Sequence, residues 1–211
     1  MNDLIRTLVE AYGPSGFEDR VRDLIRPLVE PLADEVTVDP MGNLIVHKRA
    51  ATDSQTSLKV MVAAHMDEIG VMVTHVTEKG FLRFTGLGGI YPHTLSGGRV
   101  RFADGTIGVI ASDRVEEAGT IHPVNKHYID VGATSREDCP VRVGDAAIFD
   151  RPFAARGNHL TAKSMDDRIG CAIAIEALRR LPAAVPHDLY FVFSVQEEVG
   201  TRGAEAAANS I

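Results

Sequence analysis

The chain has 211 residues, 45% of them hydrophobic, which allows one substantial core or two modest ones and argues against compositional disorder. Its formal charge of −7 and isoelectric point near 5.6 oppose binding to phosphate backbones or anionic lipid, so no nucleic-acid partner is expected. The two cysteines lack CxxC spacing, and the N-terminus has no apolar signal, which predicts a cytoplasmic protein. No segment approaches the ~20 apolar residues needed to span a bilayer, so no membrane contact is expected.

The first 30 residues predict two helices. A short helix is expected over 3–11. Ser15 and Glu18 then have the spacing of a capping box, in which both side chains satisfy free backbone donors where a helix starts. Apolar residues behind this box recur at helical spacing and predict one buried face: Val21, Leu24, Ile25 and Leu28.

Strands are predicted next along the chain. The β-branched runs 36–38 and 44–46 are separated by turn-forming residues, which indicates a hairpin. The nearly continuous apolar run 58–64 is typical of a strand covered on both sides by helices. From about 70 to 157, short β-rich runs alternate with glycines, which predicts a small all-β module.

The α/β pattern returns after the β-rich region. Apolar residues at helical spacing predict a buried helix over 165–180, with Ile169 and Ile173 widening its apolar stripe. The run 189–195 predicts a central strand, and a further helix begins near 203. We therefore predict an α/β/α domain interrupted by an inserted β-barrel-like domain. The expected boundaries are 1–69 and 158–211 for the first domain and 70–157 for the insertion.

The first group of candidate metal ligands follows the strand that ends near 64. His65 and Asp67 are two residues apart and face the same side of an extended segment, so Asp67 could hold one ring nitrogen of His65 while the other binds metal. The pattern alone is weak, because a single histidine among eight is more often structural or solvated.

A second candidate ligand, Asp166, stands at the predicted start of the helix over 165–180. A carboxylate at a helix N-terminus is usually an N-cap favoured by the free amides and the helix dipole. The same carboxylate can bridge two metal ions from a rigid position.

Adjacent acids, Glu197 and Glu198, directly follow the predicted central strand. Neighbouring carboxylates at the end of an apolar strand repel each other unless a cation compensates. Strand alternation would send them in different directions, so that one binds metal and the other reaches a water molecule. Their adjacency disfavours a glycosidase, whose acids flank the scissile bond, and no Gly-x-Ser-x-Gly elbow or phosphate loop is present.

Taken together, three segments give the chain a family resemblance. The motifs AHMDEIG at 64–70, KSMDDRIGC at 163–171 and VQEEVGTRGA at 195–204 resemble those of the M42 metallo-aminopeptidases, and the resemblance runs through the whole chain in order. Shorter supporting matches are GPSG at 13–16, DPMGN at 39–43 and DVGA at 130–133.

The resemblance implies a dinuclear site that activates water to hydrolyse the N-terminal residue of peptides with a free N-terminus. By this resemblance, His65 and Glu198 are metal ligands, Asp166 bridges both ions, Glu197 is the general base and Asp67 orients the histidine. Zinc, cobalt and manganese all suit such ligands, and the sequence does not choose among them. The inserted β domain resembles the family's dimerisation domain, which implies a homo-oligomer.

One aspartate and one histidine ligand of the family pattern have no counterpart before Ile211. We therefore expect weak binding of at least one ion, and a chain that by itself is a poor catalyst or inactive. Two alternatives follow: a non-catalytic oligomerisation or binding module, and, with less support, a cellulase-type hydrolase.

Overall fold

A computed structural model of the chain describes residues 1–51, 57–113 and 121–211. It divides into two compact units. The first combines Met1–Glu68 with Phe153–Ile211, and the second is Ile69–Pro152. Among the described residues, no helix has both the length and the apolar character needed to cross a bilayer.

The first unit is built on a four-stranded sheet. Its strands are β1 (Glu35–Val38), β2 (Leu44–Lys48), β3 (Lys59–His65) and β12 (Asp188–Ser194). Their order is β1-β2-β12-β3, in which β12 pairs parallel with β3 and the other pairs are antiparallel. The predicted hairpin and the predicted central strand are both confirmed. Because Ser194 is in register with His65, the carboxyl ends of β12 and β3 coincide.

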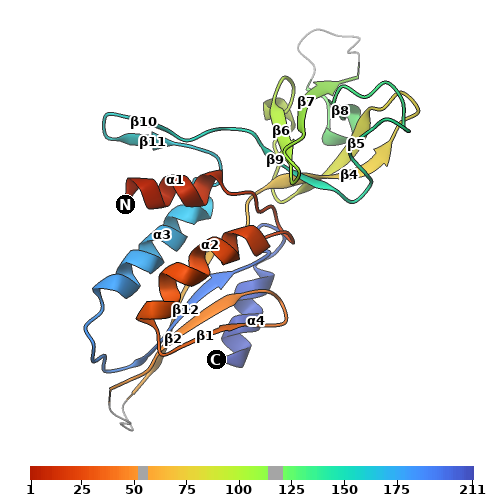
Figure 1. The fold of residues 1–211 in the computed structure, drawn as a ribbon. Coiled ribbons are helices and arrows are strands. Elements are labelled where there is room, and N and C mark those ends of the chain that lie inside the picture. Colours follow the sequence, from red (N-terminus) through yellow and green to blue (C-terminus); the bar gives the residue numbers. More distant parts are fainter. Residues whose placement is uncertain (52–56, 114–120) are drawn as a thin grey trace. The chain divides into compact units, whose positions relative to one another are not determined.

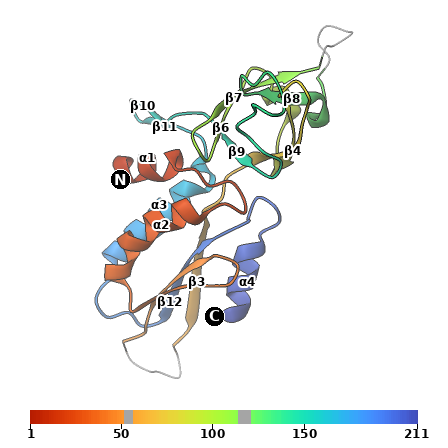
Figure 2. The ribbon, with the colours of Figure 1, turned by 45° about the vertical axis from the view of Figure 1, so that its right-hand side comes forward.

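Helices cover both faces of this sheet. They are α1 (Asn2–Glu10), α2 (Asp19–Val29, followed by the short 3-10 helix Glu30–Leu32), α3 (Met165–Arg180) and α4 (Arg202–Ser210). The first three lie on one face and α4 lies on the other (Figures 1 and 2). Val21, Ile25 and Val29 repeat at helical spacing on α2 and are fully buried in the core of this unit. The predicted α/β/α layering is confirmed.

Three burial predictions for this unit are wrong. The strand β3 is covered only in part, because Val62 is 40% exposed, and it lies at an edge of the sheet, with only β12 beside it among the described strands. On α3, Ile173 is 58% exposed and lies outside the apolar stripe. Leu24 on α2 is 37% exposed, while Val29, one turn beyond Ile25, takes the buried position.

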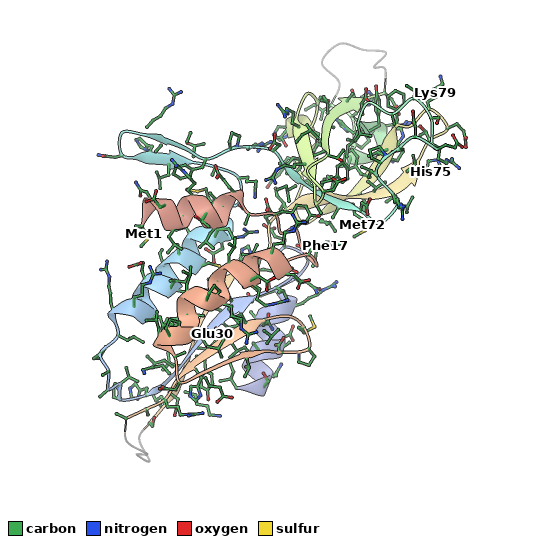
Figure 3. All side chains as sticks on the ribbon, in the orientation of Figure 1. Met1, Phe17, Glu30, Met72, His75 and Lys79 are labelled. Atoms are coloured by element: carbon green, nitrogen blue, oxygen red, sulfur yellow. The ribbon has the colours of Figure 1, made fainter. Side chains whose placement is uncertain are left out.

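The second unit is a closed barrel of six strands in the order β4-β5-β8-β7-β6-β9. The strands are β4 (Gly70–Val76), β5 (Leu82–Leu87), β6 (Arg99–Phe102), β7 (Ile107–Ser112), β8 (His127–Asp130) and β9 (Ala146–Phe149), with 3-10 turns at Pro92–Thr94 and Val124–Lys126. A separate apolar cluster forms the core of the barrel, and Figure 3 draws its side chains together with all others on the ribbon. The predicted inserted β-barrel-like fold is confirmed.

The barrel unit ends earlier than the predicted insertion. It closes at Pro152 rather than at 157, because β10 (Ala154–Arg156) and β11 (His159–Thr161) form an antiparallel hairpin that belongs to the first unit.

Candidate metal centre

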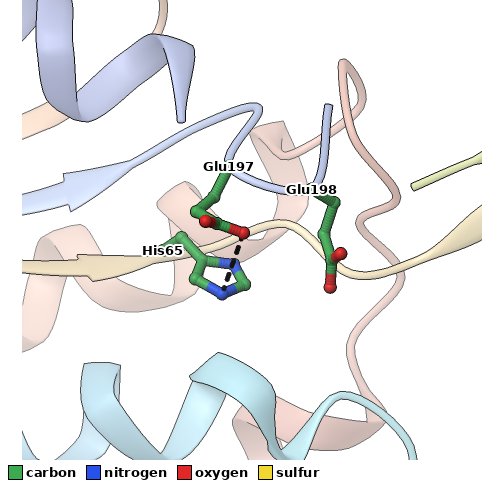
Figure 4. Close-up of side chains that lie close together, drawn as sticks. All are labelled: His65, Glu197 and Glu198. Carbon is green, nitrogen blue, oxygen red and sulfur yellow. Dashed lines mark ion pairs between the residues drawn. The ribbon is translucent and has the colours of Figure 1, made fainter. Parts of the chain in front are cut away.

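The candidate site lies where β3 and β12 end side by side in the first unit. His65 is the last residue of β3 and is 8% exposed. Glu197 and Glu198 lie on the turn that follows β12, and Figure 4 shows both beside the His65 ring. One ligand atom each from His65, Glu197 and Glu198 lie within 4.8 Å of one another, so this group could hold a metal ion.

The two glutamates do not diverge as strand alternation would predict. The strand β12 ends at Ser194, and Gln196 has a φ of 56°, in the left-handed region. The chain therefore leaves the extended conformation before it reaches the acids. As a result, both carboxylates approach the same ring, with Glu197 Oε2 at 3.8 Å from His65 Nε2.

Asp166 lies at the start of α3 and approaches His65 from there, whereas the two glutamates follow β12. Its Oδ1 lies 3.0 Å from His65 Nε2, although its side chain is 88% exposed. It is not an N-cap: Ser164 holds that position of α3, and Asp166 itself has non-helical backbone angles. The structure thus places Asp166 and Glu197 near the same ring nitrogen, His65 Nε2. Glu198 belongs with His65 and Glu197 to the group that could hold a metal ion, and Asp166 lies outside that group.

Asp67 does more than face the imidazole. Its Oδ1 is 3.4 Å from His65 Nδ1, and its backbone oxygen accepts from the same nitrogen at 3.1 Å. Its carboxylate also accepts hydrogen bonds from the backbone amides of Glu197 at 3.0 Å and Glu198 at 3.1 Å. Asp67 therefore fixes both the ring and the turn that carries the two glutamates.

The predicted capping box at Ser15 and Glu18 is wrong. The helix α2 begins at Asp19, and no described side chain caps it. Instead, the Ser15 hydroxyl donates to Asp67, and the Glu18 carboxylate accepts from the amides of Gly16 and Gln196. Both residues therefore support the site through partners far along the chain. Their spacing also fits a local helix-capping motif, and for this reason the sequence predicted the wrong role. The GPSG match at 13–16 includes Ser15, but it supports the family resemblance and indicates no role for either residue.

The electrostatics of the site favour a bound cation. Burial alone lowers the pKa of His65, but Asp67, Asp166 and Glu197 together raise it to about 9. Burial also raises the pKa of Glu198; the charge of His65 opposes this effect, and nearby carboxylates add to it. Because Nδ1 faces two oxygens of Asp67, it carries the ring proton, and Nε2 then faces carboxylate oxygens. A lone pair among carboxylates is stabilised by a proton or a metal ion, so the donor set fits a divalent cation.

This geometry agrees with the comparison to known families. The model of the M42 glutamyl aminopeptidase family matches residues 42–211, a range that includes His65, Asp166 and both glutamates. The chain belongs to the M42 glutamyl aminopeptidase family.

Individual relatives agree with this assignment. The chain is 38% identical to the lysyl aminopeptidase of Pyrococcus furiosus over 99% of its own length and 63% of the relative's. An aminopeptidase structure from the archaeon Desulfurococcus kamchatkensis has a TM-score of 0.89 and 40% identity, covering 98% of this chain and 58% of that one. The TET1 peptidase of Pyrococcus horikoshii, described as able to assemble into a tetrahedron or a large octahedral shell, has a TM-score of 0.87 and 32% identity over 99% and 64%. The chain thus spans about three-fifths of the length of the curated relatives that it matches.

Proposed function

We propose that this chain acts in a metal-dependent aminopeptidase that hydrolyses the N-terminal residue of peptides. The observation that carries the proposal is the convergence on one nitrogen, His65 Nε2, of the carboxylates of Asp166 at 3.0 Å and Glu197 at 3.8 Å. His65 and Glu197 lie at the carboxyl ends of the adjacent parallel strands β3 and β12, which is where α/β proteins place their active sites, and Asp166 reaches them from the start of α3.

In the proposed site, His65, Asp166 and Glu198 would hold two divalent ions, with Asp166 as the ligand common to both. Zinc, cobalt and manganese all suit this set of nitrogen and oxygen donors. When bound, such ions lower the pKa of a water molecule and stabilise negative charge on a carbonyl oxygen.

Glu197 is proposed as the general base. It stands on the His65 side of the site, where it can accept a proton from the attacking water. The Thr201 hydroxyl donates to Glu197 Oε1 at 3.3 Å, which leaves Oε2 directed at His65. Asp67 is proposed to hold the His65 ring in the tautomer that presents Nε2, because it faces the other ring nitrogen.

The proposed substrates are peptides with a free N-terminus, processed in the cytoplasm. We also propose that the chain assembles with copies of itself through the barrel unit. The assembly described for the similar TET1 peptidase supports self-association.

Hydrolysis of short peptides by the 211-residue chain, supplied with cobalt or zinc, tests the proposal. Wild type should release free N-terminal residues only slowly, since two ligands of the family pattern have no counterpart in this chain, and Glu197→Gln should abolish this release while it still binds metal. Glu205→Gln on α4 is a matched control, because Glu205 is exposed and outside the site. Equal activity of wild type and Glu197→Gln would remove Glu197 from the mechanism.

The same assay addresses the two alternatives. The first alternative is the non-catalytic oligomerisation or binding module. A stable oligomer that binds no metal and releases no amino acids would support that module. Release of sugar from cellulose that persists in Glu197→Gln would support the cellulase-type hydrolase.

A further inference from the structure

Beside the candidate metal centre lies a buried cluster of three charged side chains, which we call the ion cluster: Glu68, Lys163 and Arg168. Their exposed fractions are 2%, 7% and 0%. Lys163 Nζ donates to Glu68 Oε1 at 2.8 Å and Oε2 at 3.0 Å, and Arg168 Nη2 lies 3.4 Å from the same Oε1. One carboxylate therefore holds two cations.

The excess positive charge is directed at the end of α1. Arg168 donates to the carbonyl oxygens of Leu8 at 2.6 Å and Gly13 at 3.2 Å, and Lys163 donates to that of Ala11 at 2.9 Å. Carbonyl groups at a helix C-terminus carry partial negative charge, so they stabilise cations placed there. The ion cluster is thus fixed to a rigid part of the fold.

Net stability does not explain the ion cluster. Burying charges costs solvation free energy, and a buried ion pair can often be replaced by apolar side chains without loss of stability. In addition, Arg168 Nε is buried with no hydrogen-bond partner among the described residues, which is a further cost. The ion cluster therefore points to a role in fixing the position of another residue of the site.

The geometry shows what is placed. Glu68 follows His65 by three residues, while Lys163 and Arg168 stand on either side of Asp166. Between Lys163 and Arg168 the chain bends: Ser164 has a φ of 50°, and Asp166 departs from helical angles. Asp166 has an 88% exposed side chain, so little packing holds it against His65. Its position depends on the two ends of the bend.

We infer that Glu68 is a positioning residue, which pins Lys163 and Arg168 so that the bend between them presents Asp166 to the ion bound by His65. This inference rests on the proposed metal-dependent function. Glu68 does not touch the reacting groups and acts through Asp166. The chemistry it supports is the sharing of one carboxylate between two divalent cations.

Cobalt binding to wild type and Glu68→Gln tests the inference without any activity assay. The readouts are the visible absorption spectrum of bound Co²⁺ and its affinity by chelator competition. Glu68→Gln should bind Co²⁺ about 10- to 100-fold more weakly and with an altered spectrum, the loss expected when a residue that orients a ligand is changed. Val29→Ala is the control, because Val29 is fully buried in the same unit but outside the cluster. It should lose stability and keep the spectrum.

The outcomes separate this inference from the proposed function. Failure of wild type to bind Co²⁺ would overturn the proposed function and the inference with it. Binding by wild type, with the same affinity and spectrum in a folded Glu68→Gln, would overturn the inference alone.

If Glu68→Gln does not fold, Lys163→Gln replaces it, since that variant keeps the contact between Glu68 and Arg168 and frees one end of the bend. A folded Lys163→Gln with weakened binding and a changed spectrum would support the inference, and one with unchanged binding would overturn it.

Discussion

The carboxylate of Asp67 accepts a hydrogen bond from the backbone amide of Glu198 at 3.1 Å, although 131 residues separate the two in the sequence. The same carboxylate holds the amide of Glu197 and is fully buried. Because Gln196 turns the chain out of the strand, the acids depend on this distant anchor for their position. The spacing of the site is therefore set largely by Asp67.

Asp67→Asn should weaken metal binding about 10- to 100-fold while the fold is kept. The NH2 group of an asparagine would face one of the two backbone N–H groups, so two donors would meet and that hydrogen bond would be lost. Asparagine also lacks the negative charge that orients the His65 ring. Metal affinity measured by isothermal titration calorimetry checks this expectation. The control is Asp188→Asn, which should leave the affinity unchanged. Asp188 is the first residue of β12, at the end of that strand far from the site, and its carboxylate pairs with His47. Equal losses in both variants would contradict a special role for Asp67.

The metal-free chain should lose stability as the pH rises from 6.5 to about 9. The folded-state pKa of His65 is raised to about 9 from an ordinary 6.5, so its contribution is complete below pH 6.5 and is lost as the pH passes through 9. A shift of this size corresponds to about 3 kcal/mol. Urea unfolding in the presence of a chelator measures the change. His65→Gln should show a much flatter dependence, and an equal slope in both proteins would rule out His65 as its source.

Gly170→Ala should destabilise the first unit by about 1 to 3 kcal/mol, although alanine normally favours a helix by ~1 kcal/mol over glycine. A Cβ at Gly170 would collide with the carboxylate of Asp167, which accepts from the Gly170 amide at 3.0 Å. The urea midpoint reports the effect. Gly89→Ala serves as the comparison, because a Cβ there meets no described atom within 4 Å. A higher midpoint for Gly170→Ala would show that Asp167 moves aside easily.

Val46→Ala and Val62→Ala should differ in cost despite identical chemistry. Val46 on β2 is fully buried, and its truncation should cost about 2 kcal/mol from lost apolar burial and the cavity left behind. Val62 on β3 is 40% exposed, so the same change there should cost less than about 1 kcal/mol. Paired urea titrations give both values. Similar costs would indicate that Val62 is covered in solution.

Much of the fold was predictable because it depends on local patterns. The apolar spacing of α3 and the apolar run of β12 both identify elements that contribute buried residues to the core of the first unit, although Ile173 on α3 is 58% exposed. The exposure of Val62 was not predictable in this way. An apolar run reports that a strand can be buried, whereas its actual cover depends on which other segments pack against it.

The candidate ligands could be found from their type and place, and the residues that orient them could not. His65 and Glu198 follow apolar strands, which is a readable signal. Ser15 and Glu18 matched a helix cap, yet their partners lie at Asp67 and Gln196, far along the chain. A long-range hydrogen bond leaves no periodic trace in the sequence. The left-handed backbone at Gln196 likewise had no signal, since glutamine rarely adopts it.

The parallel pairing of β3 with β12 has a kinetic consequence. The segments that meet at His65 are about 130 residues apart, and the whole barrel lies between them in the chain. Contacts over such separations form slowly, because a long loop must close before they contribute free energy. A barrel that has already collapsed around its own core shortens this loop. Mutations that unfold only the barrel should therefore delay assembly of the metal centre in refolding experiments, even though they alter none of its residues.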